Sequence, residues 1–155
     1  MKLHPEQQIE KEKAYFNSIL TKERSITKWA ITDYYEPDDV NFISATTNGN
    51  LYIMAELKER NGNYNADFIE KYGALIHLKK INSLKEKAEK IKKEKGIDIV
   101  IMYMMKSSDG VTFVYNLSDE IEDKVYTKAM QFENGSKRMV EKQNINLTKY
   151  TYKWI

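Results

Sequence analysis

Cysteine is absent from the 155 residues of the chain, and histidine occurs only at His4 and His77. The lack of thiols excludes disulfides, zinc–thiolate centres, iron–sulfur clusters and cysteine nucleophiles. Two histidines argue against a histidine-rich metal site and against a Ser-His-Asp triad. We therefore expect neither thiol-based nor histidine-based chemistry.

Long apolar segments are also missing. No run approaches the ~20 residues of a membrane-spanning helix, and residues 1–6 lack the apolar core of a signal peptide. We expect no membrane partner and a cytoplasmic location. Glycine-rich phosphate loops and dinucleotide fingerprints are absent, and a net charge of only +2 differs from the strongly basic composition of nucleic-acid coat proteins.

The composition is that of an ordinary globular protein. Hydrophobic residues make up 41% and charged residues 31% of the chain, which is too apolar for a disordered protein. A chain of 155 residues fits one domain and can bury a core without covalent cross-links. There are no repeats, linkers or low-complexity segments, so we expect residues 1–155 to form a single domain.

The N-terminal third predicts a helix and three strands. Ile9, Phe16 and Ile19 follow helical spacing within residues 5–20. Residues 25–35, 40–46 and 51–58 have the β-branched, aromatic or alternating composition of strands. The last two strands are separated by Asn48-Gly49, a strong hairpin signal.

The remainder predicts a long helix and further strands. Residues 66–94 are helical in composition, but their apolar stripe changes phase, so we expect a bend near Asn82-Ser83. Residues 98–105 form a nearly continuous apolar run, typical of a strand buried on both faces, and residues 111–117 follow the Asp109-Gly110 turn as its partner. Residues 121–133 fit a helix or a strand, and residues 144–155 alternate as a final strand.

This order predicts an α/β fold in which a mixed sheet is flanked by helices. The core would span about residues 5–117, followed by a β-rich C-terminal extension over residues 118–155. Aromatic residues at 150, 152 and 154 share one side of the final strand. They fit either a cover for the sheet or a dimer contact, so a homodimer stays open.

The third strand contains the most informative residues. Glu56 and Lys58 project from the same face of its apolar end. Asp38 and Asp39 precede the neighbouring strand, and the hairpin brings the start of that strand beside the end of the next. Neighbouring carboxylates suit Mg²⁺, and a lysine beside them can serve an attacking water or stabilise phosphorane charge.

These residues resemble the PD-(D/E)xK nuclease superfamily, which has the restriction-endonuclease-like fold. The resemblance rests on Pro37-Asp38-Asp39 and, after the hairpin, Glu56-Leu57-Lys58, with an α-β-β-β-α-β core over residues 5–105. An acidic-x-Lys tripeptide is common by chance in this composition, so its position after an apolar strand carries the interpretation. The resemblance implies that an aspartate and Glu56 bind Mg²⁺ (or Mn²⁺) and that Lys58 serves the water. Pro37 directly precedes Asp38, which favours Asp38 as the metal-binding aspartate. In the superfamily this aspartate is usually followed directly by an apolar strand residue, and Val40 follows Asp39, which favours Asp39.

The superfamily often adds a glutamate from the first helix. Glu12 lies within the apolar stripe near Phe16, while Glu10 lies on the solvent side, so Glu12 is the candidate; its alternative is a solvated position at the edge of the stripe. Several branches hold phosphate with a basic residue of the second helix. Lys79 shares the face of Phe68 and would fill that role, or else extend past the core edge into solvent.

The expected function is therefore Mg²⁺-dependent hydrolysis of phosphodiester bonds, in DNA rather than RNA, although RNA stays open. Residues 79–95 contain eight lysines and would guide the nucleic-acid backbone, unless they form only a solvated helix face. A small nuclease of this kind resembles phage or mobile-element proteins. The alternatives are a catalytically inactive nuclease-like binding or assembly protein, and an unrelated α/β interaction protein with a surface Glu56–Lys58 pair. Endonuclease and exonuclease action are not distinguished.

Overall fold

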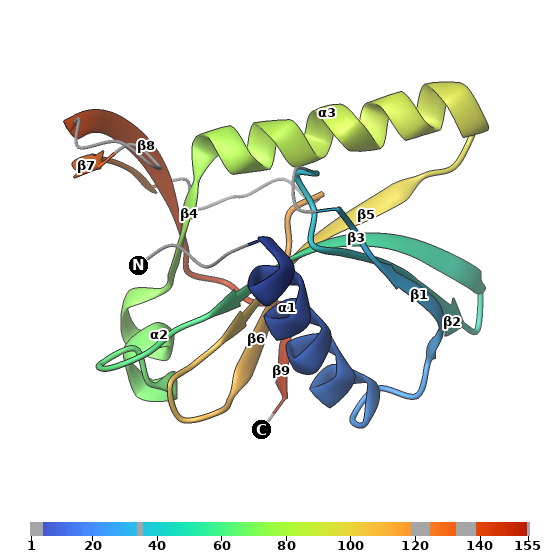
Figure 1. The fold of residues 1–155 in the computed structure, drawn as a ribbon, viewed down its shortest axis with the longest axis horizontal. Coiled ribbons are helices and arrows are strands. Elements are labelled where there is room, and N and C mark those ends of the chain that lie inside the picture. The colour runs from blue at the N-terminus through green and yellow to red at the C-terminus, as the bar shows by residue number, and fades with distance from the viewer. Residues whose placement is uncertain (1–4, 34–35, 119–124, 133–138, 155) are drawn as a thin grey trace.

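A mixed β-sheet with a helix against each face forms the body of the protein (Figure 1). The computed structural model describes residues 5–154 except 34–35, 119–124 and 133–138. Within these limits the sheet consists, in spatial order, of β1 (Ile26–Ile31), β2 (Val40–Thr46), β3 (Gly49–Glu59), β5 (Ile99–Lys106), β6 (Thr112–Asn116) and β9 (Tyr152–Trp154). β3 and β5 are parallel, and the other neighbouring pairs are antiparallel. The predicted α/β fold with a mixed, helix-flanked sheet is confirmed.

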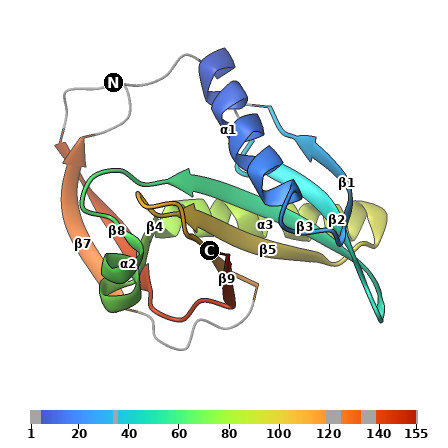
Figure 2. The same ribbon diagram turned by 90° about the horizontal axis from the view of Figure 1, so that it is seen from below.

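The two longest helices pack on opposite faces of this sheet (Figure 2). They are α1 (Pro5–Leu20), which matches the predicted first helix, and α3 (Leu78–Lys95). Side chains alternate along β3, so Ile53 and Leu57 pack under α1 while Met54 packs under α3. The same alternation directs Glu56 toward the α3 side.

Each helix is fixed by its own buried cluster. Under α1, the fully buried Phe16 ring lies 5.3 Å from the Phe42 ring, measured between centroids. Under α3, the fully buried Leu84 packs with Met54 and the fully buried Phe113. Burial of such a side chain contributes about 2 kcal/mol, so both helices are held firmly against the sheet.

The β2–β3 hairpin was predicted closely. Its register runs from Val40 opposite Ala55 to Thr46 opposite Gly49, which leaves Thr47 and Asn48 as the turn. Gly49 has a φ angle of +114°, a value that L side chains rarely adopt. This register determines which residues meet at the far end of the hairpin.

The region predicted as one bent helix is interrupted earlier than expected. It contains α2 (Ala66–Tyr72), β4 (Ala74–His77) and α3, so the break expected at Asn82-Ser83 was placed wrongly. Gly73 ends α2 with φ +83°, and its N–H donates to the carbonyl of Ile69. The four residues of β4 alternate between buried and exposed, and they pair with a strand from the C-terminal region.

That strand belongs to a second, smaller sheet. In the described part of the chain its order is β4, β8 (Met139–Leu147) and β7 (Val125–Phe132). The undecided segment 121–133 is thus a strand where it is described, while residues 121–124 and 133 lie outside the described residues. The single final strand predicted for residues 144–155 is wrong, because β8 and β9 belong to different sheets. The side chains at 152 and 154, part of the predicted aromatic stripe, lie outside the described side chains.

None of the helices in the described residues is long and apolar enough to cross a membrane.

Candidate active site

Predicted acidic residues meet where the pairing of β2 with β3 ends. The last strand pair is Val40 with Ala55. Beyond it, the Asp39 N–H donates to the Ala55 carbonyl at 2.9 Å, and Asp39 Oδ2 accepts from the Leu57 N–H at 2.7 Å. A carboxylate oxygen thus takes the place of a strand partner and holds Asp39 beside Glu56.

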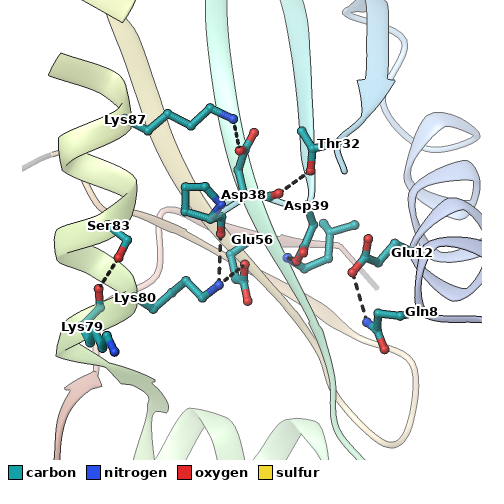
Figure 3. Close-up of polar contacts among 12 residues, drawn as sticks. Gln8, Glu12, Thr32, Asp38, Asp39, Glu56, Lys79, Lys80, Ser83 and Lys87 are labelled. Atoms are coloured by element: carbon teal, nitrogen blue, oxygen red, sulfur yellow. Dashed lines mark hydrogen bonds and ion pairs between the residues drawn. The ribbon is translucent and has the colours of Figure 1, made fainter. Parts of the chain in front are cut away.

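Asp38 and Asp39 have different environments (Figure 3). The fully buried side chain of Asp38 accepts a hydrogen bond from Lys87 Nζ at 2.5 Å, and Lys87 Nζ also lies 3.1 Å from Glu36 Oε2. The hydroxyl of Thr32 donates to the backbone carbonyl of Asp38. Asp39 instead faces Glu56 and, with Glu12, these residues form an acidic cluster, which therefore contains the favoured aspartate of the two.

Glu12 reaches this cluster from α1. Its side chain is buried, it accepts a hydrogen bond from Gln8 Nε2 at 3.1 Å, and it interacts directly with the Asp39 carboxyl group. Glu10 points away, is 74% exposed at its side chain and lies 3.6 Å from Lys13. Position within the apolar stripe therefore distinguished the two glutamates correctly, and the solvated alternative for Glu12 does not hold.

Glu56 is the member of the acidic cluster that also contacts α3. Its side chain is 17% exposed, and Lys80 Nζ lies 3.6 Å from Oε2. Lys80 also donates to the Pro37 carbonyl at 3.1 Å (Figure 3). Glu56 Oε2 is buried without a hydrogen-bond partner, although Lys80 is close enough for an ion pair. One lysine thus ties the helix to the loop before β2 and to the end of β3.

Four of the predicted residues line one cleft of about 170 Å³ between the first helix and the ends of the two strands. Glu12, Asp39, Glu56 and Lys58 all contribute to its wall, together with Gln8, Lys11, Tyr15, Leu57 and Glu59. This lining brings together four carboxyl groups and two amino groups from α1, the residue before β2 and the end of β3.

Crowding and burial change how these groups bind protons. Burial and the charge of Glu56 raise the pKa of Asp39 to about 7. Burial and the charge of Asp39 raise the pKa of Glu12 to about 7. Burial also raises the pKa of Glu56, with Lys80 acting in the opposite direction. Positive charge placed among the carboxylates would favour their ionised forms.

Lys58 lies at the wall of the cleft with its side chain exposed to solvent. Desolvation of its amino group by the cleft and the nearby Arg60 guanidinium lower the pKa of Lys58, and Glu56 and Asp39 oppose the change. A lowered pKa makes the neutral amine more accessible than it is in a free lysine. Its position beside the carboxylates gives the cleft a potential proton acceptor.

Lys79 does not join the cluster. It is exposed at the start of α3, while Lys80 points toward Glu56 (Figure 3). The expected face of Lys79 was derived from a helix continuous with Phe68, and the interruption by β4 removes that relation. Of the eight lysines in residues 79–95, only Lys80 and Lys87 are partly buried, and the other six are exposed.

Sequence reasoning missed Lys80 and Lys87. Both lie three or four residues from Leu84 on the helix, beside the apolar stripe that packs on the sheet. The stripe of Leu84, Ala88 and Ile91 therefore contained a usable signal for the two lysines that face inward. The ion pair between Lys87 and Asp38 joins residues 49 positions apart, and no local pattern specifies it.

Among the described residues, no group of three or more histidine, aspartate or glutamate side chains meets the requirements for a metal site by itself. Mg²⁺ is commonly held by only one or two carboxylates, with waters and substrate phosphate completing its coordination. Asp39 and Glu56 satisfy this smaller requirement chemically, and Glu56 Oε2, which is paired with Lys80 but accepts no hydrogen bond, is an oxygen donor for a cation. Comparison of the chain with family models, curated proteins and solved structures gave no match.

Proposed function

We propose that the protein is a Mg²⁺- or Mn²⁺-dependent nuclease of the PD-(D/E)xK type that hydrolyses phosphodiester bonds in DNA. The observation that carries this proposal is that Glu12, Asp39, Glu56 and Lys58 line one cleft. The order of α1, β1, β2, β3, α3 and β5 agrees with the α-β-β-β-α-β core that the resemblance implies, although α2 and β4 lie between β3 and α3.

Asp39 and Glu56 would hold the cation, with Glu12 as a further oxygen donor. The raised pKa values of Asp39 and Glu12 support this assignment, because added positive charge favours the ionised carboxylates. Glu56 Oε2 is buried and accepts no hydrogen bond, which also supports it. When bound, a divalent cation supplies positive charge against the phosphodiester and makes nearby water more acidic.

Lys58 would serve the attacking water. As the water oxygen forms its bond to phosphorus, its proton passes to the neutral amine of Lys58, whose pKa is lowered in the cleft. The bond from phosphorus to the leaving sugar oxygen breaks, and that oxygen takes a proton from solvent. Lys11, which is exposed at the cleft, provides positive charge for the phosphate backbone.

Cleavage of a nucleic-acid panel tests this proposal. The panel contains linear duplex, single-stranded, branched and supercoiled DNA and RNA, each with and without Mg²⁺ or Mn²⁺. We expect cation-dependent cutting of DNA that falls on the order of 100-fold or more in Glu56→Gln and Lys58→Met. Glu10→Gln, which removes an exposed charge from the same helix as Glu12, is the matched control and should cut like the wild type.

A second lysine variant separates charge from proton transfer. Lys58→Arg keeps the positive charge but cannot accept a proton near neutral pH. Loss of cutting in this variant supports the proton-acceptor role, while full activity would limit Lys58 to electrostatic stabilisation. Absence of cutting across the panel would contradict the nuclease proposal. Nucleic-acid binding retained without cutting would instead favour the inactive binding or assembly protein.

A further inference from the structure

Three aromatic rings form a row along one side of α2 and the turn that precedes it. The ring centroids of Tyr64 and Phe68 are 5.0 Å apart, and those of Phe68 and Tyr72 are 4.7 Å apart. Tyr64 is 39% exposed and Tyr72 is 51% exposed, so both rings are accessible from solvent. We refer to Tyr64, Phe68 and Tyr72 as the aromatic platform.

Cationic groups lie over both ends of the aromatic platform. The Arg60 guanidinium carbon is 5.1 Å from the Tyr64 ring centroid, and Lys71 Nζ is 5.2 Å from that of Tyr72. Rings interleaved with cations are the combination by which proteins bind single-stranded nucleic acid without sequence preference. The rings stack on unpaired bases, and the cations attract the phosphates.

The aromatic platform continues from the cleft along the chain. Lys58 and Glu59 line the cleft, and Arg60 follows directly at the end of β3. The backbone N–H of Arg60 donates to the Lys106 carbonyl at 2.8 Å, and the side-chain Nη2 of Arg60 donates to the Leu75 carbonyl at 3.4 Å. Arg60 is therefore held between the cleft and the first ring rather than extended freely into solvent.

α2 carries two acidic residues, Asp67 in its exposed first turn and Glu70, and Glu70 is paired with a lysine. Glu70 Oε1 lies 2.6 Å from Lys153 Nζ and accepts a hydrogen bond from the Tyr150 hydroxyl at 2.8 Å. These contacts tie Glu70 to the C-terminal region. They reduce its repulsion of an anionic strand near α2.

We propose that the aromatic platform binds an unpaired segment of nucleic acid beside the cleft. This inference rests on the proposed function and adds to it the form of the substrate, which would contain single-stranded DNA next to the cleaved bond. A duplex keeps its bases stacked on one another, so it cannot offer their faces to Tyr64 and Tyr72. The rival occupant is a protein partner, for which exposed tyrosines are also suited.

Fluorescence anisotropy in EDTA with the full chain tests the proposal without any cleavage. The probes are a short labelled single strand of mixed sequence and the same strand annealed to its complement. We expect Tyr72→Ala and Tyr64→Ala each to weaken binding of the single strand roughly tenfold, with little change for the duplex. Tyr72→Phe keeps the ring and should bind like the wild type. Leu51→Ala, which removes a 41%-exposed apolar side chain outside the aromatic platform, is the surface control.

Each outcome decides the matter. Selective loss of single-strand binding in the alanine variants, but not in Tyr72→Phe, supports the proposal. Unchanged single-strand affinity in the alanine variants overturns it, as does equal loss for both probes. If those variants keep wild-type DNA binding and change only self-association in sedimentation experiments, the surface is a protein interface and the proposal is wrong. Platform-dependent binding by a protein that cuts nothing would contradict the proposed function alone.

Discussion

Replacing Asp39 by asparagine is expected to stabilise the fold above neutral pH. Burial and the Glu56 charge raise the pKa of Asp39 from its ordinary value of 3.8 to about 7. Between these pH values the folded chain binds more protons than the unfolded chain, so the free energy of unfolding falls as the pH rises through this window. Above about pH 7, Asp39 is ionised in the folded chain as well, and the full cost of ionising it lowers the free energy of unfolding. Asparagine cannot ionise, and its side-chain oxygen can still accept the hydrogen bond from Leu57.

The size of the effect follows from the same shift. Ionising an isolated carboxyl group with this pKa would cost the folded state about 4 kcal/mol at a pH above 7. Asp39, Glu12 and Glu56 titrate together, and the open cleft admits solvent. We therefore expect a smaller net gain for Asp39→Asn, of about 1–3 kcal/mol.

Urea denaturation in EDTA at about pH 5 and about pH 8 measures this difference. The variant should exceed the wild type in stability at the higher pH and show a weaker dependence on pH. Asp33→Asn removes an exposed carboxylate from the loop before β2 and is the matched control. Millimolar Mg²⁺ should stabilise the wild type at the higher pH more than the variant. Equal pH dependence in both proteins, or lower stability of the variant at the higher pH, would refute the reasoning.

Two further predictions concern contacts that position the site. Lys87→Met leaves the carboxylate of Asp38 buried without its cation, so it should lower the free energy of unfolding by about 3–5 kcal/mol. Adding Asp38→Asn to this variant should recover part of the loss. A loss below ~1 kcal/mol in urea denaturation would contradict this prediction. Gly73→Ala would place a Cβ atom 2.6 Å from the Leu147 carbonyl oxygen at a φ angle of +83°, so it should destabilise by more than about 2 kcal/mol. Gly62→Ala, with φ +66° and open space around the new methyl group, should cost only about 1 kcal/mol, and equal costs for the two variants would disprove the role of the close approach.

The strand and hairpin patterns predicted the centre of the fold because their signals are local. Alternation along residues 51–58 and the Asn48-Gly49 turn specify the register that brings Glu56 beside Asp39. Helical spacing around Phe16 likewise identified Glu12. These parts of the candidate site depend on a single strand, a single helix and one hairpin, which is why sequence alone could predict that these residues lie together.

Residues whose placement depends on distant contacts were harder to predict. β4 has only four residues, and its pairing with β8 joins segments about 70 positions apart. Its short alternating pattern was therefore predicted as part of the helix over residues 66–94. The misplaced break put Lys79 on the inward face of the helix, whereas Lys80 is the residue that lies beside Glu56. The choice between Asp38 and Asp39 depended on which of the two carboxylates accepts the hydrogen bond from the Leu57 N–H. The ion pair of Lys87 with Asp38 was not predicted.

The most direct test of the central claim is the single-turnover rate of DNA cleavage as a function of Mg²⁺ concentration. Wild type, Glu56→Gln and the control Glu10→Gln would be compared on a DNA that carries an unpaired segment. The account predicts a rate that rises with Mg²⁺ and saturates in the wild type and in Glu10→Gln, and that is reduced on the order of 100-fold or more in Glu56→Gln. A rate that does not depend on the cation, or that is the same in Glu56→Gln as in the wild type, would contradict the assignment of this cleft as the active site.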